Sequence, residues 1–182
     1  FLARVDDAVA ARYRGISVDL WRAFEAGEVS SAELRVLRFV RLLEPLRPLH
    51  PQIDPEVVSR TYLGEIGRES HLLPGAEEVV RTVARTHRLV LATNGIAEVQ
   101  RARFSAATIR DCFAHVVISD EIGSAKPQRA FFDEAFRRMG NPAREEVLMV
   151  GDSLSSDIAG GIGYGIDTCW MAADASAPDP DP

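Results

Sequence analysis

The feature that constrains the fold most is an alternation of short apolar runs and helical patterns between residues 73 and 172. The apolar runs are LVLAT at 89–93, HVVIS at 115–119, VLMV at 147–150 and DTCWM at 167–171. They are continuous, which is typical of strands buried on both faces. Helical periodicity covers the intervening segments at about 76–86, 97–106, 128–139 and 154–162. The alternation predicts an α/β fold with a parallel sheet.

The first 72 residues carry helical patterns and no strand pattern. Apolar residues recur every three or four positions, and Gly27 separates two helices. Ser30 and Glu33 have the spacing of a capping box, and Asp54-Pro55 is a typical helix start. We expect a helical module over 1–72, an α/β core over 73–172 and a coil tail over 173–182.

The charge balance limits the class of partner. The chain has 27 acidic and 21 basic residues, a net charge of -6, and no basic stripe that would attract a nucleic-acid polymer. No apolar run is long enough to span a membrane, and Cys112 and Cys169 stand apart from any zinc-binding pattern. We expect a cytoplasmic protein that acts on a small molecule. Whether it is a monomer or a homodimer is open.

Polar residues follow three of the expected strands. Thr93 and Asn94 follow the first, Lys126 follows the second, and Asp152 with Asp157 follows the third. Open α/β sheets bind ligands beyond the carboxyl ends of their strands. A hydroxyl, an amide and a lysine are suited to phosphate oxygens, and carboxylates are suited to a hard cation such as Mg²⁺.

Each of these features also has an ordinary structural interpretation. Asn94-Gly95 is a common turn sequence, an isolated Lys126 is usually solvated, and an aspartate such as Asp152 often caps a helix. Their joint occurrence, in order, at three strand ends favours a binding site over three unrelated coincidences.

These segments resemble a known family. VLATNG, SDEIGSAKPQRAFF and VLMVGDSLSSDIAGG look like motifs II, III and IV of the haloacid dehalogenase superfamily, which is mostly magnesium-dependent phosphatases. The resemblance implies a Rossmann-like parallel sheet, and the helical segment is similar to the cap domain of one subgroup. LWRAFEAGEVSSAEL, GNPAREEVLMVGDS and DTCW are most similar to the 5′-nucleotidase branch, which implies a nucleoside monophosphate as substrate.

The resemblance also implies the role of each residue. Thr93 binds the transferring phosphoryl group, Asn94 adds a backbone amide, and Lys126 neutralises charge on the phosphate and the nucleophile. Asp152 ligates Mg²⁺, and Asp157 ligates it through water or orients Lys126. Phosphoryl transfer depends on positioning and charge neutralisation, which a metal and a lysine supply together.

The first motif of the family, a strand ending in Asp-x-Asp, has no match here. Its first aspartate is the nucleophile that forms an aspartyl-phosphate. Asp6-Asp7 has the wrong spacing, and Asp179-Pro180-Asp181 lies in a proline-rich tail. We expect the nucleophile in a preceding segment, because the chain starts at Phe1 and loss of a central strand would leave backbone groups unpaired. A non-catalytic relative that only binds phosphate is the alternative.

Three other interpretations compete with this one. Gly151-Asp152-Ser153-Leu154 spells a serine-esterase signature, but all four histidines precede the serine, so no base follows it. The glycines at 160–165 follow a helix, so they favour close packing and a helix C-cap over a dinucleotide fingerprint. A 2-haloacid dehalogenase needs no metal, so Asp152 and Asp157 favour a phosphatase.

The first 72 residues also contain aromatic side chains at helical spacing, which either stack a nucleotide base or form the core of the helical module. These residues are Trp21, Phe24, Phe39 and Tyr62.

Overall fold

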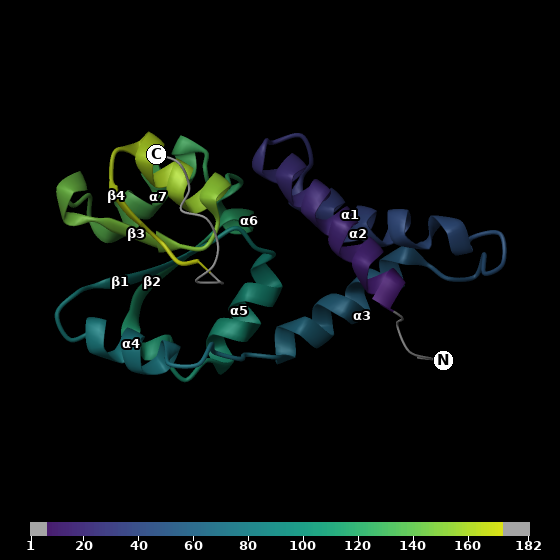
Figure 1. The fold of residues 1–182 in the computed structure, drawn as a ribbon, viewed down its shortest axis with the longest axis horizontal. Helices are drawn as coiled ribbons and strands as arrows, with labels where there is room; N and C mark the ends of the chain where they lie inside the picture. The colour runs from purple at the N-terminus through teal and green to yellow at the C-terminus, as the bar shows by residue number, and fades with distance from the viewer. Residues whose placement is uncertain (1–6, 173–182) are drawn as a thin grey trace. The chain divides into compact units, whose positions relative to one another are not determined.

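The computed structural model describes residues 7–172, which Figure 1 draws in colour. These residues form two compact units that divide between Glu121 and Ile122. The predicted domain boundaries at residues 72 and 172 remain predictions. The tail at 173–182, including Asp179 and Asp181, lies outside the described residues, as does Asp6. No helix within residues 7–172 is long and apolar enough to cross a membrane.

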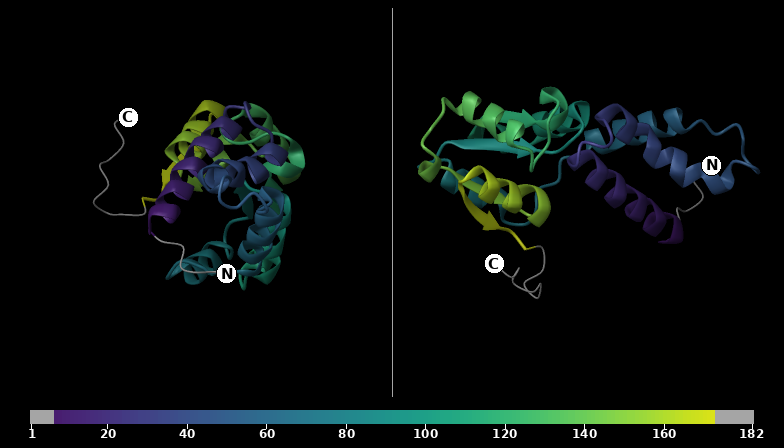
Figure 2. Two further views of the ribbon diagram at one scale, coloured as in Figure 1. Left: turned by 90° about the vertical axis from the view of Figure 1, so that its right-hand side faces the viewer. Right: turned by 90° about the horizontal axis from the view of Figure 1, so that it is seen from above.

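The first unit joins three long helices to one pair of strands. Its elements are α1 (Asp7–Glu25), α2 (Ser31–Leu43), η1 (Glu44–Leu46), α3 (Pro55–Arg68), α4 (Ala76–Val83), β1 (Leu89–Thr93), α5 (Ala97–Ala106), η2 (Arg110–Cys112), β2 (Phe113–Ile118) and α6 (Ser119–Ile122), which ends at the boundary. Helix α1 packs on α2, α2 on α3, and α3 on α5 (Figure 2). Leu20 and Leu34 are completely buried in these contacts.

The predicted helix starts are confirmed. The Ser30 hydroxyl accepts a hydrogen bond from the Glu33 amide, and the Glu33 carboxylate accepts one from the Ser30 amide, so the capping box is complete. The Asp54 carboxylate accepts a hydrogen bond from the Glu56 amide at the start of α3. These side chains satisfy amides that have no partner inside their helices.

The second unit surrounds another pair of strands. Its elements are α7 (Arg129–Met139), η3 (Arg144–Glu146), β3 (Leu148–Gly151), the π-helical turn η4 (Leu154–Ile158), α8 (Ala159–Tyr164) and β4 (Asp167–Trp170). Its core contains Phe131, Phe132, Phe136 and Tyr164. The added Cβ of a residue at 161 would overlap Thr168 on β4, and Gly165 is a left-handed C-cap. Both observations confirm the interpretation of the 160–165 glycines.

The strands are parallel, as predicted, but they do not form one sheet. Strand β1 pairs with β2 and β3 pairs with β4, which gives two separate two-stranded sheets among the described residues. Strand β3 was expected to be buried on both faces, yet Leu148 and Val150 are 56% and 48% exposed. The prediction was wrong here because a two-stranded sheet covers too little surface, and no third described strand extends it.

Candidate active site

A tight turn after β3 positions Asp152, Ser153 and Asp157 in the second unit. Ser153 is the N-cap of η4, and its hydroxyl accepts a hydrogen bond from the Ser156 amide at 3.2 Å. The Ser153 carbonyl accepts bonds from the amides of both Asp157 and Ile158, at 2.9 and 3.1 Å. Ser153 therefore organises a helix start, and the turn brings Asp157 back toward the end of β3.

Lys126 and Asp157 form a buried ion pair. The ammonium nitrogen lies 2.6 Å from one Asp157 carboxylate oxygen, and each side chain is only 7% exposed. The other Asp157 oxygen accepts a hydrogen bond from the Ser153 amide at 3.1 Å. Lys126 also lies 5.7 Å from the centroid of the Phe131 ring, which is completely buried. Asp157 thus fixes the lysine in one position.

Gly151 makes room for this carboxylate. A Cβ atom added at position 151 would overlap the Asp157 side chain, including its carboxylate. Only glycine lets the strand backbone and the carboxylate approach so closely. The last residue of β3 is therefore coupled sterically to Asp157 and, through it, to Lys126.

Asp152 differs from Asp157 in its environment. It follows β3 directly, is exposed, and its backbone carbonyl accepts a hydrogen bond from the Trp170 indole at 3.1 Å. This bond ties the backbone of Asp152 to the end of β4. Asp152 is accessible to solvent at the carboxyl end of the strand.

Thr93 and Asn94 belong to the first unit. Thr93 is the last residue of β1 and is half-buried. The Asn94 side-chain amide donates to the Glu25 carboxylate at 3.3 Å, at the end of α1. Asn94 is thereby linked to the helical segment as well as to the strand that it follows.

Asp120 is a structural residue to which the sequence interpretation assigned no role. One of its oxygens accepts hydrogen bonds from the Ala97 amide at 2.9 Å and from Arg35 at 2.7 Å. It supplies the N-terminal cap of α5, which Ile96 cannot provide. The signal was present, because an aspartate two residues after strand β2 has an oxygen available for a neighbouring helix start.

The carboxylates present suit Mg²⁺ as a partial ligand set. No three Asp, Glu, His or Cys side chains within residues 7–172 gather closely enough to hold a metal by themselves. Mg²⁺ keeps several waters and is usually bound by one or two carboxylates. The exposed Asp152 fits a direct ligand. Asp157, with both oxygens already engaged, fits a water-mediated or orienting role.

Comparison with known proteins places these features in a family. Residues 3–165 match the model of the haloacid dehalogenase-like hydrolases. The pyrimidine 5′-nucleotidase YjjG of Escherichia coli is 34% identical over 161 residues, which cover 88% of this chain and 69% of that protein. The pyrimidine 5′-nucleotidase PynA of Streptococcus pneumoniae is 31% identical over 152 residues, covering 83% of this chain and 63% of that protein.

A solved structure agrees with these matches. The magnesium-bound crystal structure of the HAD-hydrolase YfnB from Bacillus subtilis is 30% identical and superposes with a TM-score of 0.85, covering 92% of this chain and 74% of that one. This similarity shows the α/β fold of the family, of which the described strands form the two small parallel sheets. The chain therefore spans about two thirds to three quarters of these relatives, and it belongs to the haloacid dehalogenase-like hydrolases.

Proposed function

We propose that the protein is a magnesium-dependent phosphatase that hydrolyses a small phosphomonoester, with a nucleoside 5′-monophosphate as the substrate class. The observation that carries the proposal is the buried Lys126–Asp157 pair at 2.6 Å, which lies beside the strand end that carries Asp152. A lysine held in this way offers a fixed positive charge to a phosphate group, without reorganisation during the reaction.

The proposed roles are those that the resemblance to the family implies for each residue. Thr93 donates its hydroxyl, and Asn94 its backbone amide, to the phosphoryl oxygens. Lys126 neutralises charge on the phosphoryl group, and Asp157 keeps its ammonium in place. Asp152 holds Mg²⁺, which when bound neutralises phosphate charge. The nucleophilic aspartate, which forms the aspartyl-phosphate, belongs to a segment outside residues 1–182, and helices α1–α3 act as the cap domain.

The nucleotide assignment is supported by two relatives. YjjG and PynA are both named pyrimidine 5′-nucleotidases, at 34% and 31% identity. A metal is favoured by the chain itself, because the Asp152 carboxylate is exposed at this strand end and is a type of ligand suited to Mg²⁺. The matched dehalogenase structures, at 17–24% identity, show the fold alone.

The test is a release assay on the full-length protein with nucleoside monophosphates, sugar phosphates and 2-chloropropionate, each with and without Mg²⁺. We expect phosphate release that requires Mg²⁺ and falls by about a hundredfold to a thousandfold in Lys126→Ala. Metal-independent chloride release would instead establish a dehalogenase. Phosphate binding without turnover would establish a binding protein.

A further inference from the structure

The loop between β1 and α5, residues 94–96, is attached to the three long helices of the first unit. The Asn94 side-chain amide donates to the carboxylate of Glu25, the last residue of α1, at 3.3 Å. Ile96 packs in a buried apolar cluster with Leu63 of α3. Because Asn94 is a proposed phosphate ligand, the long helices contact this loop where it would bind the phosphoryl group.

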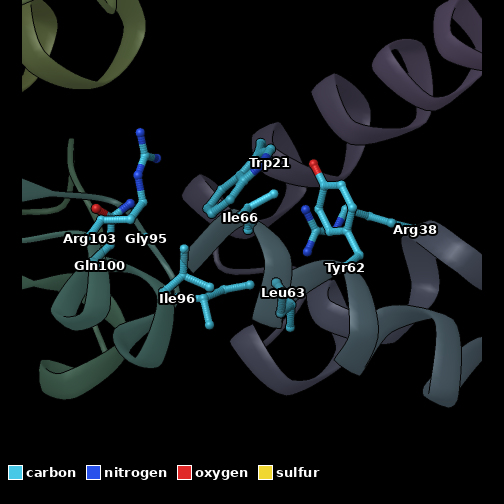
Figure 3. A pocket seen from close by; sticks show the side chains of 10 residues that line it. Trp21, Arg38, Tyr62, Leu63, Ile66, Gly95, Ile96, Gln100 and Arg103 are labelled. Carbon is cyan, nitrogen blue, oxygen red and sulfur yellow. The ribbon is translucent and has the colours of Figure 1, made fainter. Parts of the chain in front are cut away.

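Apolar packing leaves part of the contact between the loop and the helices open. A pocket of about 220 Å³ is lined by Gly95 and Ile96 of the loop, and by Trp21 of α1 and Ile66 of α3 (Figure 3). A space of this size has room for several water molecules. Apolar packing therefore covers only part of the loop, and the polar contacts near the pocket contribute to its position.

Asp120 holds the far end of the loop. Strands β1 and β2 are parallel, with Thr93 opposite Ile118, and Asp120 follows Ile118 by two residues. One Asp120 oxygen accepts a hydrogen bond at 2.9 Å from the amide of Ala97, which is the first residue of α5. This bond joins the end of one strand to the helix that follows the other. Asp120 therefore fixes the point at which the loop enters α5.

Arg35 of α2 holds Asp120 in this position. Its Nη2 donates to the same Asp120 oxygen at 2.7 Å, and its Nη1 donates to Glu98 at 3.2 Å. The Arg35 carbonyl accepts a hydrogen bond from the Ser59 hydroxyl of α3 at 2.7 Å, so the arginine is fixed to two helices. The side chains of Arg35 and Asp120 are 29% and 14% exposed, so water competes less for this pair than for one on the open surface.

We propose that Arg35 is a positioning residue for the phosphate site. Acting through Asp120, it fixes the strand end and loop that present Thr93 and Asn94 to the phosphoryl group. The inference rests on the proposed phosphatase function, and it adds a residue that touches neither substrate nor metal. A displacement of about 1 Å at a reacting group costs as much as a hundredfold in rate. Since all phosphomonoesters share the phosphoryl group, loss of Arg35 should affect every substrate alike.

The first test compares ribose 5-phosphate and uridine 5′-monophosphate, which differ in leaving group, as substrates of the full-length protein. We expect Arg35→Met to lower kcat/KM for both by about tenfold to a hundredfold, and by the same factor to within about twofold. Arg68→Met breaks an ion pair of α3 whose side chains are 75% and 65% exposed, and this matched control should change kcat/KM by less than about twofold. A loss confined to one substrate would place Arg35 at the leaving group and overturn the proposal.

A double variant tests whether Arg35 acts through Asp120. If it does, Arg35→Met and Asp120→Asn disturb the same contact, so their combination should lower kcat/KM by no more than about twice the larger single loss. Losses that multiply would show that the two residues act independently, which would also overturn the proposal.

Two measurements without turnover separate a positioning role from general support of the fold. In Arg35→Met we expect the Ala97 amide to exchange its hydrogen at least about tenfold faster, while the amides of α7 in the second unit keep their rates. Inorganic phosphate should bind correspondingly more weakly, as measured by calorimetry. Faster exchange throughout the protein, or an unchanged Ala97 amide, would overturn the proposal. If Arg35→Met does not fold, Arg35→Lys replaces it, because lysine keeps the charge but lacks the fork that reaches two carboxylates.

These results distinguish this proposal from the phosphatase proposal. If the parent protein releases no phosphate from any substrate, the phosphatase proposal fails, and the Ala97 exchange and the binding of inorganic phosphate still test the role of Arg35. If the parent is an active phosphatase and Arg35→Met is equally active, the positioning role fails and the phosphatase stands.

Discussion

The Lys126 ammonium and the Asp157 carboxylate are buried and in direct contact, so each neutralises the charge of the other. Such a pair gains little over apolar residues of the same shape, but loss of one partner leaves the other charged and unpaired in the interior. We expect Asp157→Asn to lower the free energy of unfolding by about 3–5 kcal/mol, measured by urea denaturation. Glu65→Gln removes a pair whose side chains are 65% and 75% exposed, and should cost less than about 1 kcal/mol. Equal effects would contradict the burial argument.

Gly151 gives a second test at the same place. In Gly151→Ala the added methyl group overlaps the Asp157 side chain, so we expect a loss of about 1–3 kcal/mol in unfolding free energy. Gly64 in α3 is the control, because nothing lies within 4 Å of a Cβ built there. Gly64→Ala should be stabilising by about 0.4–1 kcal/mol. A Gly151→Ala variant as stable as the parent would show that the carboxylate moves aside freely.

At the scale of the element, helix α5 depends on a side chain from outside itself. Burial raises the pKa of Asp120, but the neighbouring Ser31 hydroxyl and the hydrogen bonds from the Ala97 amide and Arg35 outweigh it, so the pKa lies below the ordinary 3.8. A lowered carboxyl pKa stabilises the fold above the ordinary value, and this contribution disappears as pH falls through the lowered value.

The expected result is a pH-dependent difference between the parent and Asp120→Asn. The parent should be more stable at pH 7, and the difference should shrink below about pH 4, as Asp120 becomes protonated. Denaturant titrations from pH 3 to pH 7 measure it. If the two proteins differ in unfolding free energy by more than the experimental error, and this difference is the same at pH 3 as at pH 7, Asp120 acts through its shape and not its charge.

The elements that could be predicted from the sequence are those set by local chemistry. Strand β1 and helix α5 have the predicted bounds, because a continuous apolar run and a clear helical pattern define them. The helix expected at 154–162 instead begins with the π-helical turn η4, since the Ser153 carbonyl accepts two amides. Helix α4 ends at Val83, three residues short of the expectation.

The parts that could not be predicted are contacts between distant residues. The Lys126–Asp157 pair joins residues 31 positions apart, and the choice between ligand and orienting roles for Asp157 depends on its geometry. The Arg35–Asp120 pair joins residues 85 positions apart, so it is visible only in the packed structure.

For the whole molecule, the relevant fact is that the described chain divides between Glu121 and Ile122. Thr93 and Asn94 belong to one unit, and Lys126, Asp152 and Asp157 belong to the other. The single parallel sheet expected from the sequence is replaced by two pairs of strands, because no described strand joins β1 and β3. Alternation of apolar runs predicts strands and their direction, but it does not predict which strands are neighbours.

Metal binding gives a prediction at this scale. A ligand that binds only the folded protein stabilises it, by about 2.7 kcal/mol at a hundredfold excess over Kd. We expect Mg²⁺ to raise the Tm of the full-length protein and EDTA to reverse the rise. Asp152→Ala, an exposed substitution, should leave the Tm without metal nearly unchanged and abolish the increase. A Tm increase that survives in this variant would place the metal elsewhere.

The overlap between position 151 and Asp157 also sets the order in which the two residues can change. Alanine at 151 is obstructed as long as the aspartate is present, whereas a smaller residue at 157 frees the space that a methyl group needs. The two substitutions are therefore non-additive, and alanine at 151 costs less once the residue at 157 is smaller and Lys126 has lost its partner. A descendant of this chain with alanine at 151 would therefore lose less by giving up the buried ion pair, and restoring aspartate at 157 would bring back the overlap with the methyl group.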